Sequence, residues 1–138
     1  MVTLSRVTQE QHYFLQEAIV LLEQGRVEFE EMPLEMYLNL SLHLAKAYML
    51  YYELTREKRY ALITQQIMKA LSHVDHAEVL FFLAYASAAK EEPAMTRHWL
   101  TKYSKRKDFD FELVQQHPCF NHYREEAWFI NLLKQKMH

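Results

Sequence analysis

The stretch DHAEVLFFLAYASAAKEEPAMTRHWLTKY, residues 75–103, decides the fold. It holds an apolar run from Val79 to Ala86, a break just before Pro93, and a second amphipathic run that ends at Leu100. This order predicts two helices joined by a very short turn. Such a hairpin cannot hide both of its apolar faces from water by itself, so it implies further helices packed on each side.

The composition favours long helices with tight connections. A chain of 138 residues fits one domain, residues 1–138, built around one core. It has one glycine and three prolines, which is little of the material that strands need for their turns. The nine Tyr, eight Phe and two Trp must fill helix interfaces or line a groove. We therefore predict an all-α fold.

The first half of the chain carries signals for three helices. Thr8 suits the start of the first helix, and Gly25 suits the left-handed position that ends it. Pro33 suits the first position of a second helix, from Leu34 to about residue 54, whose apolar residues spread too widely for one narrow stripe. The charged cluster 56–59 predicts a turn. A third helix follows, with its apolar stripe at Tyr60, Ile63, Ile67, Ala70 and Leu71.

The second half predicts three more helices, about six in all. Asp75 and Glu78 suit the capped start of the helix that ends near Lys90, and Pro93 opens its partner. After the basic cluster the chain changes character, and a last helix runs from about Tyr123 to residue 136. Trp128, Phe129, Leu132 and Leu133 give this helix an apolar face, so we expect it to close the core as a terminal cap.

A loose internal repeat connects the two halves. The pattern Leu44-Ala45-x-x-Tyr48 recurs as Leu83-Ala84-x-x-Ser87, and each copy is followed by a second helix. This pattern resembles the tetratricopeptide repeat, in which a large apolar, a small and an aromatic residue follow one another on the first helix. Leu80 and Leu100 also fit the family's positions, whereas Ser87, Thr96 and Tyr103 depart from them.

The resemblance covers roughly residues 34–133 and includes a closing segment with Asp110-Phe111 and Pro118-Cys119-Phe120. It implies a short right-handed stack of helical hairpins with a C-terminal capping helix. An irregular helical bundle with accidental periodicity is the alternative. Both architectures are all-α.

The charge balance argues against large anionic partners. A net charge of −2 and a pI near 6.4 give no broad attraction to nucleic acid or to anionic lipid. The first eight residues lack the features of a signal peptide, and no apolar run reaches about 18 residues. Cys119 is the only cysteine, so no intrachain disulfide is expected. We expect a cytoplasmic protein that binds neither nucleic acid nor a membrane.

The one dense basic stretch, Lys102 to Lys107, has two interpretations. Positive charge is favourable at the carbonyl end of a helix, which we expect near Ser104 or Lys105. The alternative is a phosphate site. The first interpretation is favoured because the stretch is short and because Asp108 and Asp110 follow it directly.

Under the resemblance, the first helix of each pair lines a concave groove that binds another protein or a peptide segment. Methionine adapts to irregular apolar surfaces, and aromatic rings give large contact area at low entropic cost. The predicted groove residues are Asn39, Leu42, Lys46, Met49, Glu78, Phe81 and Tyr85. The alternative for Phe81 and Tyr85 is a place in the core. This reading makes the chain a non-catalytic adaptor or chaperone without a cofactor, and a homodimer is also compatible with it.

A second hypothesis concerns the His/Cys group near the C-terminus. His117, Cys119 and His122 lie within six positions, and His73, His76 or His98 could complete a zinc site. The spacing matches no strong ligand signature, and a cysteine beside Phe120 is more often a small buried residue. Metal or small-ligand binding is therefore the runner-up. The sequence also has no phosphate loop, nucleophile elbow or HExxH pair, so we expect no enzyme.

Overall fold

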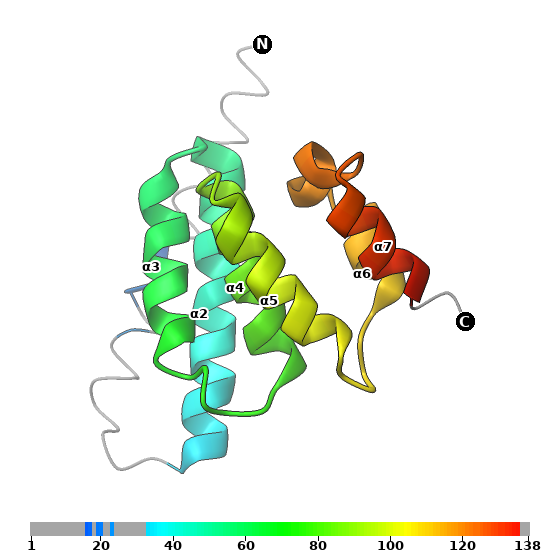
Figure 1. Cartoon of the computed structure of the whole chain (residues 1–138). Helices are drawn as coiled ribbons and strands as arrows, with labels where there is room; N and C mark the ends of the chain where they lie inside the picture. The colour runs from blue at the N-terminus through cyan, green and yellow to red at the C-terminus, as the bar shows by residue number, and fades with distance from the viewer. Residues whose placement is uncertain (1–15, 18, 21–22, 24–32, 136–138) are drawn as a thin grey trace. The chain divides into compact units, whose positions relative to one another are not determined.

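The computed structural model describes residues 16, 17, 19, 20, 23 and 33–135 of the chain (Figure 1). The predicted caps of the first helix, Thr8 and Gly25, lie outside the described residues. The chain divides into two compact units, residues 1–71 and residues 72–138, and each is described by itself. Whether the chain forms a single domain stays a prediction.

Within the described ranges the regular structure is entirely helical and no strand occurs, which confirms the predicted all-α class. The elements are α2 (Leu34–Thr55), α3 (Lys58–Lys69), α4 (Ala77–Ala89), α5 (Pro93–Ser104), α6 (Phe111–Gln116), the 3-10 helix η1 (Pro118–Tyr123) and α7 (Ala127–Gln135). None of these helices is long and apolar enough to cross a membrane.

In the first unit, α2 and α3 form an antiparallel hairpin (Figure 1). The helix α2 buries a wide face, as its broad apolar pattern predicted. Pro33 lies just before the helix rather than at its first position, and its carbonyl accepts a hydrogen bond from the Tyr37 amide at 3.0 Å. The proline still suits this place, because it fixes its own backbone without withdrawing an amide that the helix needs.

The turn between α2 and α3 is shorter than the sequence predicted. Only Arg56 and Glu57 separate the helices, so the predicted turn at 56–59 is wrong in its second half. Arg56 adopts the left-handed conformation, with φ of 59°, and its amide donates to the Tyr52 carbonyl at 2.6 Å. With a single glycine in the chain, a non-glycine residue takes this position at a cost of about 1–2 kcal/mol.

The buried face of α3 differs from the predicted stripe. Ile67 is buried and Leu71 is buried just beyond the helix, but Ala70 is exposed. The buried residues of α3 are Ala61, Thr64, Gln65, Ile67 and Met68. Thr64 and Gln65 escape a hydrophobicity pattern because they are polar. The Thr64 hydroxyl is satisfied internally, since it donates to the Tyr60 carbonyl at 2.9 Å.

In the second unit, α4 and α5 form the predicted hairpin (Figure 1). Every residue of α4 from Phe81 to Ala89 is buried, in keeping with its almost continuous apolar sequence. The predicted cap is wrong by one residue. His76 caps α4, because its Nδ1 accepts from the Glu78 amide at 3.2 Å, and Asp75 instead pairs with Arg106.

The turn between α4 and α5 closes in a defined way. The Glu92 amide bonds the Ser87 carbonyl and the Glu91 amide bonds the Ala88 carbonyl, each at 3.0 Å. These two bonds make a Schellman motif, with Glu91 in the left-handed conformation at φ of 60°. Pro93 then opens α5, as predicted, and the helix ends at the predicted Ser104.

The closing segment contains two short helices that the sequence analysis did not assign. Asp110 starts α6, because its carboxylate accepts from the Leu113 amide at 3.0 Å. Pro118 starts η1 after His117. Both starts carry ordinary signals, an aspartate cap and a proline at the first position, but each helix has only six residues. Such helices are too short for a periodic pattern.

The last helix, α7, packs against α5 and helps to complete the core of this unit. Phe129 and Leu132 are buried, whereas Trp128 and Leu133 are half-buried, so the predicted apolar face is the packed one. The rings of Phe120 and Phe129 lie 6.2 Å apart, which joins η1 to α7. The helix begins four residues later than predicted, at Ala127.

Candidate functional site

The seven predicted groove residues divide into a buried and an exposed set. Leu42 and Met49 on α2 and Phe81 and Tyr85 on α4 are all at most 8% exposed. The exposed set consists of Asn39, Lys46 and Glu78. A partner that binds the chain without rearranging it would therefore reach only the polar members of the predicted groove.

Phe81 lies at the centre of an aromatic cluster in the second unit. Its ring lies 5.6 Å from Phe82, 6.0 Å from Tyr103 and 6.3 Å from Phe120, measured between ring centroids. The ring of Tyr85 lies 5.9 Å from that of Phe81 and 4.5 Å from the imidazole of His117. These contacts give both residues a packing role, which is the alternative that the sequence left open for them.

Asn39 and Lys46 belong to an exposed face of α2 that the sequence analysis did not identify as a whole. At 100° per residue, Met36, Asn39, His43, Lys46 and Leu50 fall within about 80° of one another around the helix axis. All five are exposed, and the two apolar ends are 59% exposed at Met36 and 55% exposed at Leu50. We call these five residues the α2 face. Their spacing of three and four is visible in the sequence, but exposure is not.

The polar middle of the α2 face is ordered by its own backbone. The Nδ1 of His43 lies 2.7 Å from the carbonyl oxygen of Asn39, one turn earlier. A carbonyl oxygen only accepts, so Nδ1 carries the proton of this hydrogen bond. The face therefore has a polar middle, with Asn39, His43 and Lys46, between an apolar side chain at each end.

The predicted His/Cys group does not gather into a metal centre. His117 uses its Nδ1 to accept from the Cys119 amide at 3.2 Å, and its ring packs against Tyr85. Within residues 33–135 and the five earlier described positions, no three His, Cys, Asp or Glu side chains are arranged to hold a metal ion. The observed part that His117 plays is that of a helix cap.

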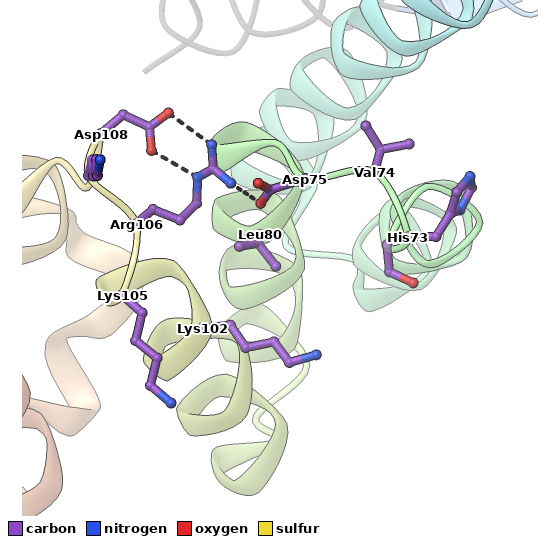
Figure 2. Close-up of a pocket in the computed structure, with 10 residues that line it drawn as sticks. His73, Val74, Asp75, Leu80, Lys102, Lys105, Arg106 and Asp108 are labelled. Carbon is purple, nitrogen blue, oxygen red and sulfur yellow. Dashed lines mark hydrogen bonds and ion pairs between the residues drawn. The ribbon is translucent and has the colours of Figure 1, made fainter.

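A pocket of about 830 Å³ opens in the second unit between the start of α4 and the end of α5. Its lining residues are Ser72, His73, Val74, Asp75, Leu80, Lys102, Lys105, Arg106, Lys107 and Asp108 (Figure 2). The sequence singled out the basic part of this set but not the loop before α4. The two meet only because the α4–α5 hairpin returns the chain to its starting end.

Arg106 is the organising side chain of this pocket, which we call the Arg106 pocket. Its Nε donates to Oδ1 of Asp108 at 2.8 Å, and the guanidinium also pairs with Asp75 (Figure 2). The hydrogen bond to Asp108 raises the pKa of Arg106, and the same bond lowers the pKa of the Asp108 carboxyl. Both carboxylates of the pocket are thus engaged by one cation.

The three lysines of the Arg106 pocket have a different environment. Lys102, Lys105 and Lys107 are exposed, and no carboxylate in the described part of the chain forms an ion pair with them. The Lys102 ammonium lies 5.3 Å from the centre of the Trp99 ring, which is a cation–π contact rather than a neutralising one. Their charge is available to a ligand.

Comparison with known proteins identifies no relative: no family model, no curated protein and no solved structure matches the chain.

Proposed function

We propose that the chain is a non-catalytic protein-interaction module, an adaptor or chaperone, whose α2 face receives a helical segment of a partner protein. The observation that carries this proposal is the exposure of Met36 and Leu50 at the two ends of one helix face, with Asn39 and Lys46 between them. Apolar side chains at helical spacings on one face are the anchors by which one helix binds another.

The length of the α2 face suits a helix rather than a turn or a loop. Met36 and Leu50 are 14 residues apart, which corresponds to about 21 Å along the helix axis. A partner helix of about four turns spans this distance and presents anchors at i and i+3 or i+4 spacings. The proposed partner segment is therefore an amphipathic helix with an apolar anchor near each end.

The expected affinity is modest. Burial of a methionine or leucine side chain contributes about 1.5–3 kcal/mol, so two anchors contribute about 3–6 kcal/mol before the entropic cost of association. Even without that cost, about 6 kcal/mol corresponds to a dissociation constant of about 40 µM, so we expect a weak, transient complex with a dissociation constant no tighter than this.

The tetratricopeptide-like arrangement is part of this proposal. It is supported by two helical hairpins, α2 with α3 and α4 with α5, each of them joined by a tight turn. In such an array the first helix of a pair carries the binding surface, and α2 is the first helix of its pair. Solution of an experimental structure of the full chain tests the handedness and the stacking.

The first experiment locates the partner on the surface. A photoreactive benzoylphenylalanine replaces Lys46 in the full chain, and a matched control carries it at Lys69, an exposed lysine on α3. We expect one defined adduct from position 46 in an extract of the source cell and none from position 69. Mass spectrometry of the adduct identifies the attached segment.

The second experiment measures the anchors with a synthetic peptide of that segment. Fluorescence anisotropy compares the unchanged chain with M36A/L50A and with Leu62→Ala, which removes an exposed apolar side chain from α3. We expect the double substitution to weaken binding at least tenfold and the control to leave it unchanged. Equal affinity for all three proteins, with unaltered thermal melts, would refute the α2 face as the site.

A further inference from the structure

The lining of the Arg106 pocket carries a net positive charge. The lining contains Arg106 and three lysines against two carboxylates, so the formal balance is +2 with His73 neutral. The carboxylates of Asp75 and Asp108 are both held on Arg106. Arg106 neutralises one of these two carboxylates, so the three lysines outweigh the other and leave the lining with a net charge of +2.

Two features of the sequence argued against a phosphate site, the shortness of the basic stretch and the two aspartates that follow it, and the structure answers the second. Asp108 is engaged by two guanidinium nitrogens of Arg106, Nε at 2.8 Å and Nη2 at 3.3 Å. Asp110 does not line the pocket and uses its carboxylate to cap α6 at the Leu113 amide. Neither aspartate competes with a ligand for the lysines.

The two helix ends at the pocket do not change this balance. The positive amino end of α4 lies near Asp75, and the negative carbonyl end of α5 lies near Lys105. Each helix end is equivalent to about half an elementary charge, and the two have opposite sign. Full charges on three ammonium groups outweigh them. The lysines therefore decide the sign of the potential in the pocket.

The donors suit a multiply charged anion such as a phosphate. The planar fork of an arginine would add bidentate recognition of a carboxylate or a phosphate, but the one arginine of the lining already uses its fork on Asp108. Lysine ammonium groups act as point charges with rotatable donors, which suits the several oxygens of a phosphate. Three of them around one pocket match a group that carries more than one negative charge.

The rest of the lining gives the pocket an apolar part and a useful size. Leu80 and Val74 are both half-buried and line it beside the charged residues, and Figure 2 shows Leu80 between Arg106 and Lys102 in that view. A volume of about 830 Å³ lies within the range of about 300–1,000 Å³ found for small-molecule sites. Free inorganic phosphate would fill only a small part of it.

We propose that the Arg106 pocket binds a small organic phosphate, attracted by the charge of Lys102, Lys105 and Lys107, with its carbon skeleton against Leu80 and Val74. This site goes beyond the α2 face, since all of its residues lie in the second unit. The Arg106 pair with Asp75 and Asp108 holds the loop before α4 and the loop after α5 together, so it shapes the pocket.

The test uses pyrophosphate as the probe, because it presents the multiply charged group without a specific skeleton. Isothermal titration calorimetry on the full chain compares pyrophosphate with sodium sulfate at matched ionic strength. We expect saturable binding of pyrophosphate and at least tenfold weaker binding of sulfate. A panel of sugar phosphates and nucleoside monophosphates is then titrated, and we expect some members to bind more tightly than pyrophosphate.

The matched variants are K105A/K107A in the pocket and K69A/K134A outside its lining, each of which removes two exposed lysines. Charged hydrogen bonds are worth about 1.5–3 kcal/mol each, so the pocket variant should bind pyrophosphate at least about tenfold more weakly. The control variant should bind it unchanged. Circular dichroism melts show that both variants are folded.

Three outcomes would overturn the proposal. The first is the lack of saturable pyrophosphate binding to the folded, unchanged chain. The second is an equal loss in both lysine variants, which would show a general charge effect. The third is tight binding of a glutamate-rich peptide in place of pyrophosphate with the same dependence on Lys105 and Lys107, which would assign the pocket to acidic protein segments.

Discussion

Arg106 holds Asp108 through two donors on one side of its guanidinium, with Nε on Oδ1 at 2.8 Å and Nη2 on Oδ2 at 3.3 Å. The two residues are only two positions apart, so the pair closes the turn after α5. The same guanidinium reaches Asp75, which is 31 positions earlier. A short-range pair thereby becomes a connection between both ends of the α4–α5 hairpin.

The Arg106–Asp108 pair predicts a loss of stability in acid. The pKa of Asp108 is lowered from an ordinary value of 3.8, chiefly by the hydrogen bond to Arg106. Because the pKa of Asp108 is lower in the folded than in the unfolded chain, the ionised carboxylate stabilises the folded state above pH 3.8. This stabilisation is lost as the pH falls further. In Asp108→Asn we expect a flatter dependence of the melting temperature on pH between 2 and 5. An equal pH dependence of the melting temperature in Asp108→Asn and in the unchanged chain would contradict this prediction. The control is Glu112→Gln, which removes a carboxylate that does not pair with Arg106 and should keep the pH dependence of the unchanged chain.

Tyr51 predicts a loss of stability in alkali. Burial, followed by a hydrogen bond with Tyr60, raises the pKa of Tyr51 from 10.0 to about 12. The folded state therefore keeps the phenol neutral, and its contribution is complete below pH 10 and lost as the pH rises to 12. Urea unfolding between pH 9 and 12 should show a shallower decline for Tyr51→Phe. The neighbouring, half-buried Tyr52 provides the control, and Tyr52→Phe should keep the full slope.

We predict that His76, as the N-cap of α4, contributes measurably to the free energy of unfolding. Its Nδ1 accepts from the Glu78 amide, which would otherwise be one of the unsatisfied donors at the start of α4. Removal of a cap costs about 1 kcal/mol, so His76→Ala should lower the free energy of unfolding by that amount at pH 8. His76→Asn supplies an equivalent acceptor for the Glu78 amide, so its free energy of unfolding should equal that of the unchanged chain. If urea unfolding shows equal stability for all three proteins, the cap contributes nothing.

We predict that replacing Glu91 by glycine stabilises the folded chain. Its left-handed backbone at φ of 60° is needed by the Schellman motif, and a residue with a Cβ is strained there. Glu91→Gly should raise the free energy of unfolding by about 1 kcal/mol. Glu91→Ala removes the same carboxylate but keeps the Cβ, so it should not raise the free energy of unfolding. A gain in both variants would assign the effect to the carboxylate instead.

Phe81 predicts a large loss of stability on truncation. It is 8% exposed and contacts the rings of Tyr103, His117 and Phe120. Phe81→Ala should destabilise the chain by about 3–5 kcal/mol, as for other buried aromatic residues. Urea unfolding followed by circular dichroism measures it. An unaltered melt of Phe81→Ala would contradict the packing role and favour the sequence-based prediction that Phe81 lines a binding groove.

The helices were predictable where their signals are local. The apolar run of α4, the break before Pro93 and the end of α5 at Ser104 all follow from residues close in sequence. The short α6 and η1 were missed because six residues give no periodic pattern. The cap of α4 was misplaced because Asp75 is the better N-cap by composition, but Arg106 takes its carboxylate.

The candidate sites divide in the same way. Asn39, Lys46 and Glu78 were predicted from helical spacing, under the family resemblance, to line a groove, and they are exposed. Leu42, Met49, Phe81 and Tyr85 share that spacing but are buried, because periodicity says which residues share a face and not what packs against it. The Lys102–Lys107 stretch was visible, whereas the loop that completes its pocket was not.

The sequence by itself therefore determined the all-α class, the helical hairpin of residues 75–103 and the position of its turn, since these depend on apolar periodicity, proline placement and the scarcity of glycine. Only the tertiary structure decided that Asp75 and Asp108 meet on Arg106 and that three lysines beside them form no ion pair with a carboxylate of the described residues. The physical reason is that electrostatic balance depends on distances in space. A hairpin brings together residues 31 positions apart, and no local pattern records which charges then pair.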